Sequence, residues 1–367
     1  MADYRLVVST YVKRFSSTGL ASKFHPVAGP NDTLRYGLRA LTTLRRLNPS
    51  SLMDLSTVFA LSLAIITYSN QLVGYGTQPI VEAALQSVGL WLGSCIDSHW
   101  VAADSNLVCV VFYDTIDCLL RRKRPIVRLD IPDMHHYIDR YLGVCHPLLP
   151  LLYDLCVIGA QAKSVAVGDD GSSSTLEADF CHQALESLEG LWDRVSAWAP
   201  SLPFDSSSRH TSHQISHMLA QALCFQLVAK LLIVEYYASF PWSLSTPTTL
   251  LPSSTIAEQV FGVLRATREE TGRFTRYVSF PYFCAALTLG CVDGMTTAAP
   301  EDTQTYREGL LQELRSYSHG IRTATCEAMQ RFAEFAWRVQ DGRHKDIAPV
   351  QSWIELIELW PTFTIAL

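Results

Sequence analysis

The sequence predicts an all-α fold, and three observations lead to that class. Hydrophobic residues make up 48% of the 367 residues and charged residues only 17%, so the chain can bury a large core. Long apolar segments recur with the spacing of helices, and several exceed about 15 residues, which is too long for typical strands. Alternation of period two is nowhere sustained. We therefore expect a single large helical domain.

The order of the expected helices follows directly from these apolar segments. Their first residues are Ser51, Pro79, Ser105, His146, Leu176, His213, Ser254, Ser279 and Thr303, the last segment running to Gln340. Gly, Pro, Ser and Asp cluster at 167–175, 199–212, 240–254 and 296–302, and each cluster predicts a loop between helices. Ser254 or Thr255 with Glu258 resembles a capping box at a helix start. We expect residues 1–49 to be an N-terminal extension packed on a helical domain of residues 50–367.

Charge and cysteine usage exclude several classes of protein. The net charge is −6 and basic residues form no long stripe, so direct nucleic-acid binding is not expected. The ten cysteines include no C-x-x-C pair and lie among apolar neighbours, which indicates reduced thiols and an intracellular, cytoplasmic protein. No run reaches about 18 apolar residues, so no membrane span is expected. His213 and His217 stand one turn apart but lack the H-E-x-x-H glutamate, so a metal site there is not expected.

Several segments in a fixed order carry a resemblance to a known family. They are FYDTIDCLLRRKRP, YLGVCHPLLPLLYDLCVIGAQAK, the helix ending LLIVEYY, VSFPYFCAALTLGCV and FAEFAWRVQ. Together they resemble the helical regulatory domain of fungal zinc binuclear cluster transcription factors, which implies an all-helical fold. Those regulators read DNA through six N-terminal cysteines with C-x-x-C spacing, and this sequence contains no such cluster. We therefore expect the chain not to be a complete regulator of that type.

A free-standing domain of this kind also resembles the noncanonical humulene synthases of fungal tropolone-sesquiterpenoid pathways. This second resemblance implies a helical sesquiterpene cyclase that converts farnesyl diphosphate to a humulene-type hydrocarbon with Mg²⁺ and a lysine. Ionising such a diphosphate requires divalent cations held by carboxylates and basic groups on the phosphate oxygens. It also requires an apolar, aromatic cavity around the carbocation.

The stretch DTIDCLLRRKRP is the first candidate for that chemistry. Asp114, Asp117 and Arg121 fall within roughly a 60° arc of a helix surface. We expect Asp114 and Asp117 to bind the metal and Arg121 to hold diphosphate. The structural alternative stays open, because Asp117 and Arg121 also form an ordinary i, i+4 ion pair. In that interpretation the basic run and Pro125 simply end the helix.

A lysine within an apolar run is the second candidate. Lys230 interrupts ALCFQLVAKLLIVEYY, where an unpaired ammonium would be costly to bury. We expect Lys230 to be a catalytic residue and a clamp for the diphosphate, with Gln226, Tyr113 and Phe225 in the substrate pocket. The structural alternatives are a side chain that extends to solvent, or an ion pair with a residue such as Glu235.

Two hypotheses from different classes follow from the sequence. The leading one is a Mg²⁺-dependent sesquiterpene cyclase acting on an isoprenoid diphosphate. The alternative is a ligand-sensing or dimerising transcriptional regulatory module without its own DNA-binding domain, which would be nuclear. The sequence leaves the oligomeric state open in either case, and a homodimer is one possibility because helical proteins of both classes commonly pair.

Overall fold

The computed structural model describes most of the chain from residue 51 onward. The described residues are 42–44, 46, 51–72, 77–92, 104–129, 138–166, 174–203, 209–239, 250–291, 300–318, 323–344, 347, 350 and 352–360. Almost all of the predicted extension, 1–49, therefore lies outside the described residues. The division at residue 49 stays a prediction.

Helices make up the regular structure of the described chain, as the sequence predicted. They are α3 (Leu52–Leu72), α4 (Gln78–Leu92), α6 (Ser105–Arg121), the 3₁₀ turn η1 (His146–Leu148), α7 (Leu149–Ala166), α8 (Ser174–Ala197), α10 (Ser212–Ala238), α11 (Ser253–Thr271), α12 (Ser279–Gly290), α13 (Pro300–Tyr317), α14 (Thr323–Gln340) and α15 (Ile354–Glu358). The described residues contain no β-strand, and one isolated bridge pairs Asp139 with Gly143. The all-α prediction is confirmed.

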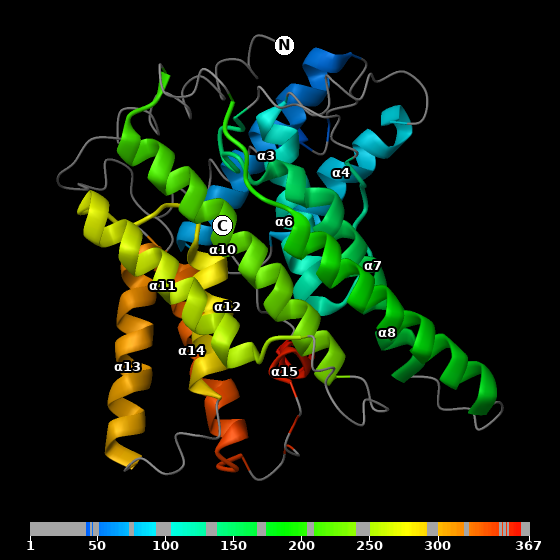
Figure 1. Cartoon of the computed structure of the whole chain (residues 1–367). Helices are drawn as coiled ribbons and strands as arrows, with labels where there is room; N and C mark the ends of the chain where they lie inside the picture. The colour runs from blue at the N-terminus through cyan, green and yellow to red at the C-terminus, as the bar shows by residue number, and fades with distance from the viewer. Residues whose placement is uncertain are drawn as a thin grey trace.

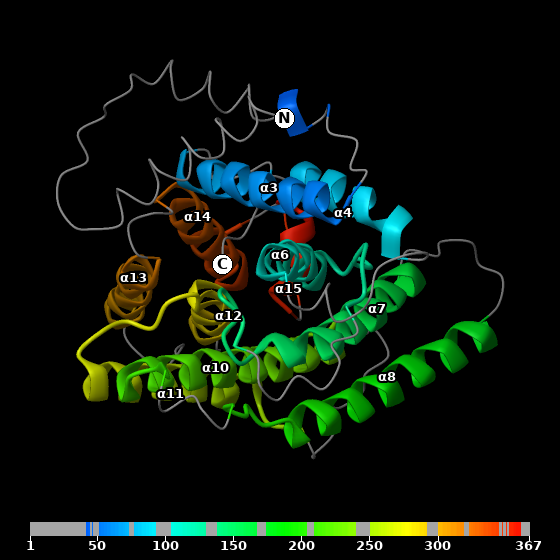
Figure 2. The same ribbon diagram turned by 90° about the horizontal axis from the view of Figure 1, so that it is seen from above.

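The helices surround α6, which lies at the centre of the molecule. In Figure 2, α3 and α4 form one outer layer, and α7, α8, α10 and α11 lie on the opposite side. Between them lie α6, α12, α14 and the short α15, and Figure 1 shows α13 along one edge. Helix α6 contacts α3, α4, α7 and α15, so side chains on its different faces reach different parts of the fold.

The ends of α6 and α10 follow local sequence signals. Asp104 caps α6 by accepting hydrogen bonds from two backbone N–H groups of the first turn. The helix ends at Arg121, four residues before Pro125 as predicted, and Arg122 adopts the left-handed conformation with φ 51°. At the start of α10, Thr211 and Gln214 form a reciprocal capping box.

Two predictions about the helices need correction, and one short helix was not predicted. Helix α11 begins at Ser253 after Pro252 with no side-chain cap, so the expected box with Glu258 is absent there. Proline at the N-cap leaves no side-chain acceptor for the first turn. The expected long helix from Thr303 to Gln340 is two helices, because α13 ends at Tyr317 and α14 begins at Thr323. Helix α15 was not expected, because five residues are too few to show a period.

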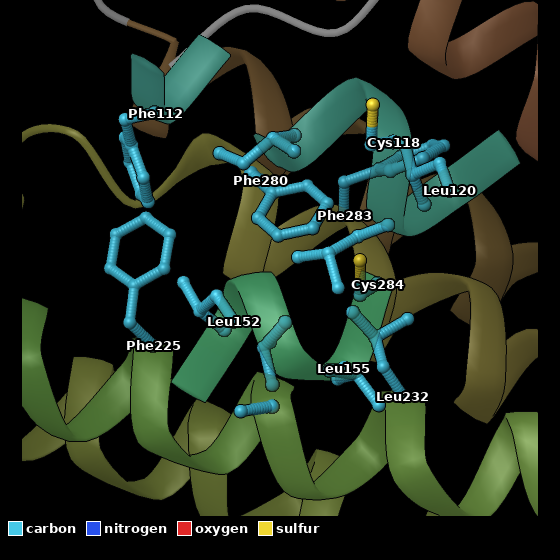
Figure 3. Close-up of a cluster of buried hydrophobic side chains, with 14 of the residues drawn as sticks. Phe112, Cys118, Leu120, Leu152, Leu155, Phe225, Leu232, Phe280, Phe283 and Cys284 are labelled. Atoms are coloured by element: carbon cyan, nitrogen blue, oxygen red, sulfur yellow. The ribbon is translucent and has the colours of Figure 1, made fainter. Parts of the chain in front are cut away.

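The centre of the fold is filled by aromatic and aliphatic side chains. Figure 3 shows Phe112 of α6 beside Phe225 of α10, and their ring centroids are 5.0 Å apart in an edge-to-face arrangement. Phe280 and Phe283 of α12 continue this cluster, and all four rings are almost fully buried. The eight cysteines whose side chains the structure describes are thiols, all buried apart from the half-buried Cys291, as their apolar neighbours predicted.

Helix α10 is long and apolar enough to cross a membrane by length and composition. In the structure, 61% of its most apolar 18-residue window is buried against other helices. A central helix of a packed bundle passes the same test, so this feature is weak evidence for a span. The absence of a membrane span stays a prediction.

Candidate functional site

Asp114 is a buried anchor for the chain that follows its own helix. Its side chain is 0% exposed, and Oδ2 accepts a 2.8 Å hydrogen bond from the backbone N–H of Ile126. Oδ1 accepts from Nε2 of Gln78 on α4 at 3.2 Å, and the Cys118 thiol lies 3.8 Å from the same oxygen. Burial raises the pKa of Asp114 above its ordinary value, while the hydrogen bonds from Ile126 and Gln78 oppose that shift. The carboxyl group therefore joins α6, α4 and the segment after α6.

Asp117 forms the intrahelical ion pair that the structural alternative predicted. Arg121 Nε donates to Asp117 Oδ1 at 3.0 Å, and the two side chains are 16% and 12% exposed, in that order. Desolvation raises the pKa of Asp117 despite the neighbouring guanidinium. The next arginine, Arg122, pairs instead with Glu358 of α15 at 2.8 Å, so successive basic residues of the RRKR run have different partners.

Lys230 belongs to α10, and its half-buried side chain reaches toward α8. Its Nζ lies 5.2 Å from the ring centroid of Trp192 on α8, a cation–π contact. Burial lowers the pKa of the Lys230 ammonium. Gln226, one turn earlier, donates from Nε2 to the backbone carbonyls of Val195 and Trp198 at 2.7 and 2.6 Å. This face of α10 therefore covers the end of α8.

The residues predicted for one diphosphate pocket point to different parts of the fold. Asp114 contacts α4, whereas Lys230 contacts α8, and Figure 2 shows α4 and α8 on opposite sides of α6. The hydroxyl of Tyr113 accepts a 3.4 Å hydrogen bond from Asn70 on α3. Phe225 packs between α6 and α12 in the central cluster. The structure does not bring these side chains together around a shared cavity.

The geometry of the carboxylates does not fit a magnesium site. Mg²⁺ requires near-octahedral oxygen ligands and usually retains several waters. Asp114 is fully buried with both oxygens engaged, and one oxygen of Asp117 is engaged by Arg121. In the part of the chain that the structure describes, no three His, Cys, Asp or Glu side chains are grouped as metal ligands would be. Magnesium binding stays a prediction from the second resemblance.

A surface groove of about 620 Å³ lies between α7, α8 and the segment after α6, and we refer to it as the basic groove. Its charged and aromatic lining comprises Arg124 and Arg128 of that segment, Tyr153 and Asp154 of α7, and Arg194 of α8. Asp154 accepts from Arg128 Nη1 at 2.7 Å and from Arg194 Nη1 at 2.9 Å, one on each oxygen. A single carboxylate thus links two guanidinium groups from different elements.

Tyr153 supports the remaining guanidinium of the basic groove. Arg124 Nε donates to the Tyr153 hydroxyl at 3.3 Å, and the Arg128 guanidinium lies 5.4 Å from the centroid of the same ring. The side chains of Arg128 and Arg194 are 44% and 53% exposed, which leaves both open to solvent. The basic groove is therefore accessible, with its arginines oriented by contacts on α7.

Short-range patterns place these groups on one surface. Burial alternates from residue 124 to 129, so Arg124, Ile126 and Arg128 face outward while Pro125, Val127 and Leu129 face the core. Ser187, Gly190 and Arg194 of α8 are spaced i, i+3 and i+7, which puts them on one helix face. Sequence reasoning missed the groove because six residues of alternation are too short to stand out. The signal in RPIVRL was nevertheless present.

Comparison with known proteins identifies one family. The family described as "Fungal specific transcription factor domain" matches residues 40–365, which is most of the chain and includes every described helix. Neither a curated protein nor a solved structure matches the chain. The first resemblance in the sequence is therefore supported, and the humulene synthase branch is not confirmed.

Proposed function

We propose, because this chain belongs to the fungal specific transcription factor domain family, that it is a ligand-sensing regulatory module acting on transcription. The observation that carries the proposal is the family match over residues 40–365, since it includes the whole helical body. A fold alone does not establish a function, so the contacts within the body must also be compatible with the proposal. On this proposal the protein acts in the nucleus.

The side-chain contacts favour this function over the sesquiterpene cyclase. A cyclase needs its metal carboxylates and phosphate clamp around one apolar cavity. Here Asp114 anchors Ile126, Asp117 pairs with Arg121, and Lys230 lies over a ring of α8. The interior of the fold is packed with phenylalanine, leucine and cysteine side chains (Figure 3). Asp114, Asp117 and Lys230 thus each make a contact that stabilises the helical fold, and such contacts are expected in a regulatory domain without catalytic activity.

A transcription assay tests the proposal. The full chain is fused to a heterologous DNA-binding domain and expressed with a reporter that carries the cognate sites. A regulatory module is expected to change reporter output relative to the DNA-binding domain alone. Equal output from a stable, nuclear fusion would overturn the proposal.

The competing activity is tested on the purified chain. Farnesyl diphosphate is supplied with and without Mg²⁺, and the organic extract is analysed by gas chromatography and mass spectrometry. The regulatory proposal predicts no hydrocarbon above the boiled-protein control. A Mg²⁺-dependent sesquiterpene would instead establish the cyclase and make Lys230→Ala the first variant to examine.

A further inference from the structure

We propose that the basic groove binds a phosphate monoester group, carried by a small molecule or by a phosphorylated protein segment. The proposal names the ligand class of the regulatory module and in that respect rests on the proposed function. The charges, the side-chain contacts and the open space of the groove all favour such a ligand.

The first step is the charge balance of the groove. Its lining contributes three guanidinium groups, from Arg124, Arg128 and Arg194, and one carboxylate, from Asp154. One carboxylate offsets one guanidinium, so the lining retains an excess of two positive charges at neutral pH. A phosphate monoester carries about −1.5 to −2 charges at that pH, which matches this excess. The whole chain has a net charge of −6, so the groove differs in sign from the protein around it.

The second step is the geometry of the donors. A guanidinium has five N–H donors in a planar fork and binds phosphate oxygens in pairs. Asp154 accepts one hydrogen bond from Nη1 of Arg128 and one from Nη1 of Arg194, and the Tyr153 hydroxyl accepts one from Nε of Arg124. These contacts orient the guanidinium groups before a ligand arrives, and further N–H groups on Arg124 and Arg194 can serve the ligand. Pre-orientation lowers the entropy that binding would otherwise cost.

The third step is the space beside the charges. Val157 and Ile158 of α7 form an apolar part of the lining, and Ser187 adds a hydroxyl from α8. A Cβ built on Gly190 meets no atom within 4 Å, so the groove is open at this point of α8. A volume of about 620 Å³ falls within the range of small-molecule sites, roughly 300 to 1,000 Å³. The groove can therefore hold a phosphate group together with the apolar atoms attached to it.

Nucleic acid is a less suitable occupant of this surface. Nucleic-acid backbones are followed by basic stripes that contact several phosphates in succession. The groove gathers three arginines in a single concave site, two of them paired with Asp154 and Arg124 bonded to Tyr153, and the chain as a whole is acidic. That arrangement suits one dianionic group rather than a polymer.

The test measures binding by isothermal titration calorimetry on the purified full chain. Phenyl phosphate represents a small ester, and a short phosphoserine peptide represents a modified protein segment. Phenol and the unphosphorylated peptide are the matched neutral probes. We expect saturable binding of the phosphorylated probes only, and weaker binding as salt is raised because the charges are exposed.

Two variants assign that binding to the groove. Arg194→Ala removes a half-exposed guanidinium and should weaken binding about tenfold or more. Gly190→Glu places a carboxylate in the open space and should abolish binding, while glutamate favours helix more than glycine does. The matched controls are Arg265→Ala and Gly262→Glu on α11, which lies away from α7 and α8 (Figure 1). Circular dichroism establishes that each variant is folded.

The outcomes separate the two sources and the two proposals. Tighter binding of the phosphopeptide would identify a modified protein segment, and tighter binding of phenyl phosphate would identify a small ester; both support the site. The proposal is overturned if neither probe saturates, or if the groove variants bind as the α11 controls do. Because calorimetry uses no reporter, failure here is distinguishable from failure of the transcription assay.

Discussion

Glu235 is predicted to make the stability of this protein fall as pH rises toward neutrality. Its side chain on α10 is 6% exposed, and the Ser352 hydroxyl donates to Oε2 at 2.5 Å. Desolvation raises the pKa of Glu235 from 4.5 to about 7, although hydrogen bonds from Ser352 and Trp353 act in the opposite direction. The residue lies where the chain that leads into α15 packs on α10, so its ionisation bears on the docking of the C-terminal helix.

The sign and size of the effect follow from the difference in pKa between the two states. The protonated form is favoured in the folded protein, so folding is most stable below the unfolded pKa of 4.5. As pH rises from 4.5 to about 7, the unfolded state loses its proton first, and the free energy of unfolding decreases. Each unit of pKa difference corresponds to about 1.4 kcal/mol, so the loss approaches about 3 kcal/mol at pH values above the folded pKa. Glu235→Gln mimics the protonated side chain and should remove this loss.

Urea denaturation followed by tryptophan fluorescence, at a series of pH values from 5 to about 8, measures the effect. Glu235→Gln should lie within about 1 kcal/mol of the native protein near pH 5 and exceed its free energy of unfolding by about 2 to 3 kcal/mol near pH 8. Glu258→Gln, on the exposed face of α11, changes the net charge equally and serves as the control. Parallel pH profiles for the native protein and Glu235→Gln would refute the reasoning, because the carboxyl would then titrate alike in both states.

Three further substitutions test individual contacts through the urea midpoint. Gly159→Ala should cost about 2 kcal/mol, because its Cβ would lie 2.4 Å from the buried Tyr236 ring; an unchanged midpoint would mean that the ring moves freely. Arg307→Lys should cost about 2 kcal/mol, since lysine cannot reproduce the paired bonds to Asp341 at 2.7 and 2.9 Å; native stability would contradict that role. Asp114→Ala should cost about 3 kcal/mol by leaving buried donors without an acceptor, whereas a purely catalytic aspartate would leave stability unchanged.

Local patterns in the sequence were sufficient for most of the fold. The stop before Pro125 and the clusters between 167 and 302 depend on residues close in sequence, so the helix boundaries near them could be predicted. The burial of the face of α10 that carries Lys230 depends on α8, a separate segment, and no pattern within α10 specifies that partner. Likewise, helical spacing placed Asp114 and Asp117 on one face but could not show that Asp114 would bind Ile126, which follows the helix.

The contact between Asp114 and Ile126 also links the predicted motif to the basic groove. The backbone N–H of Ile126 is held by a carboxylate of α6, and Arg124 and Arg128 each lie two residues from that point. Because burial alternates along this segment, fixing Ile126 orients both arginines outward over α7. Asp114 is therefore a positioning residue for the groove, although it contacts no ligand itself. The sequence alone groups the aspartates and basic residues of this stretch into one diphosphate site. In the structure, Asp114 instead anchors the segment after α6, and that segment presents Arg124 and Arg128 to the groove.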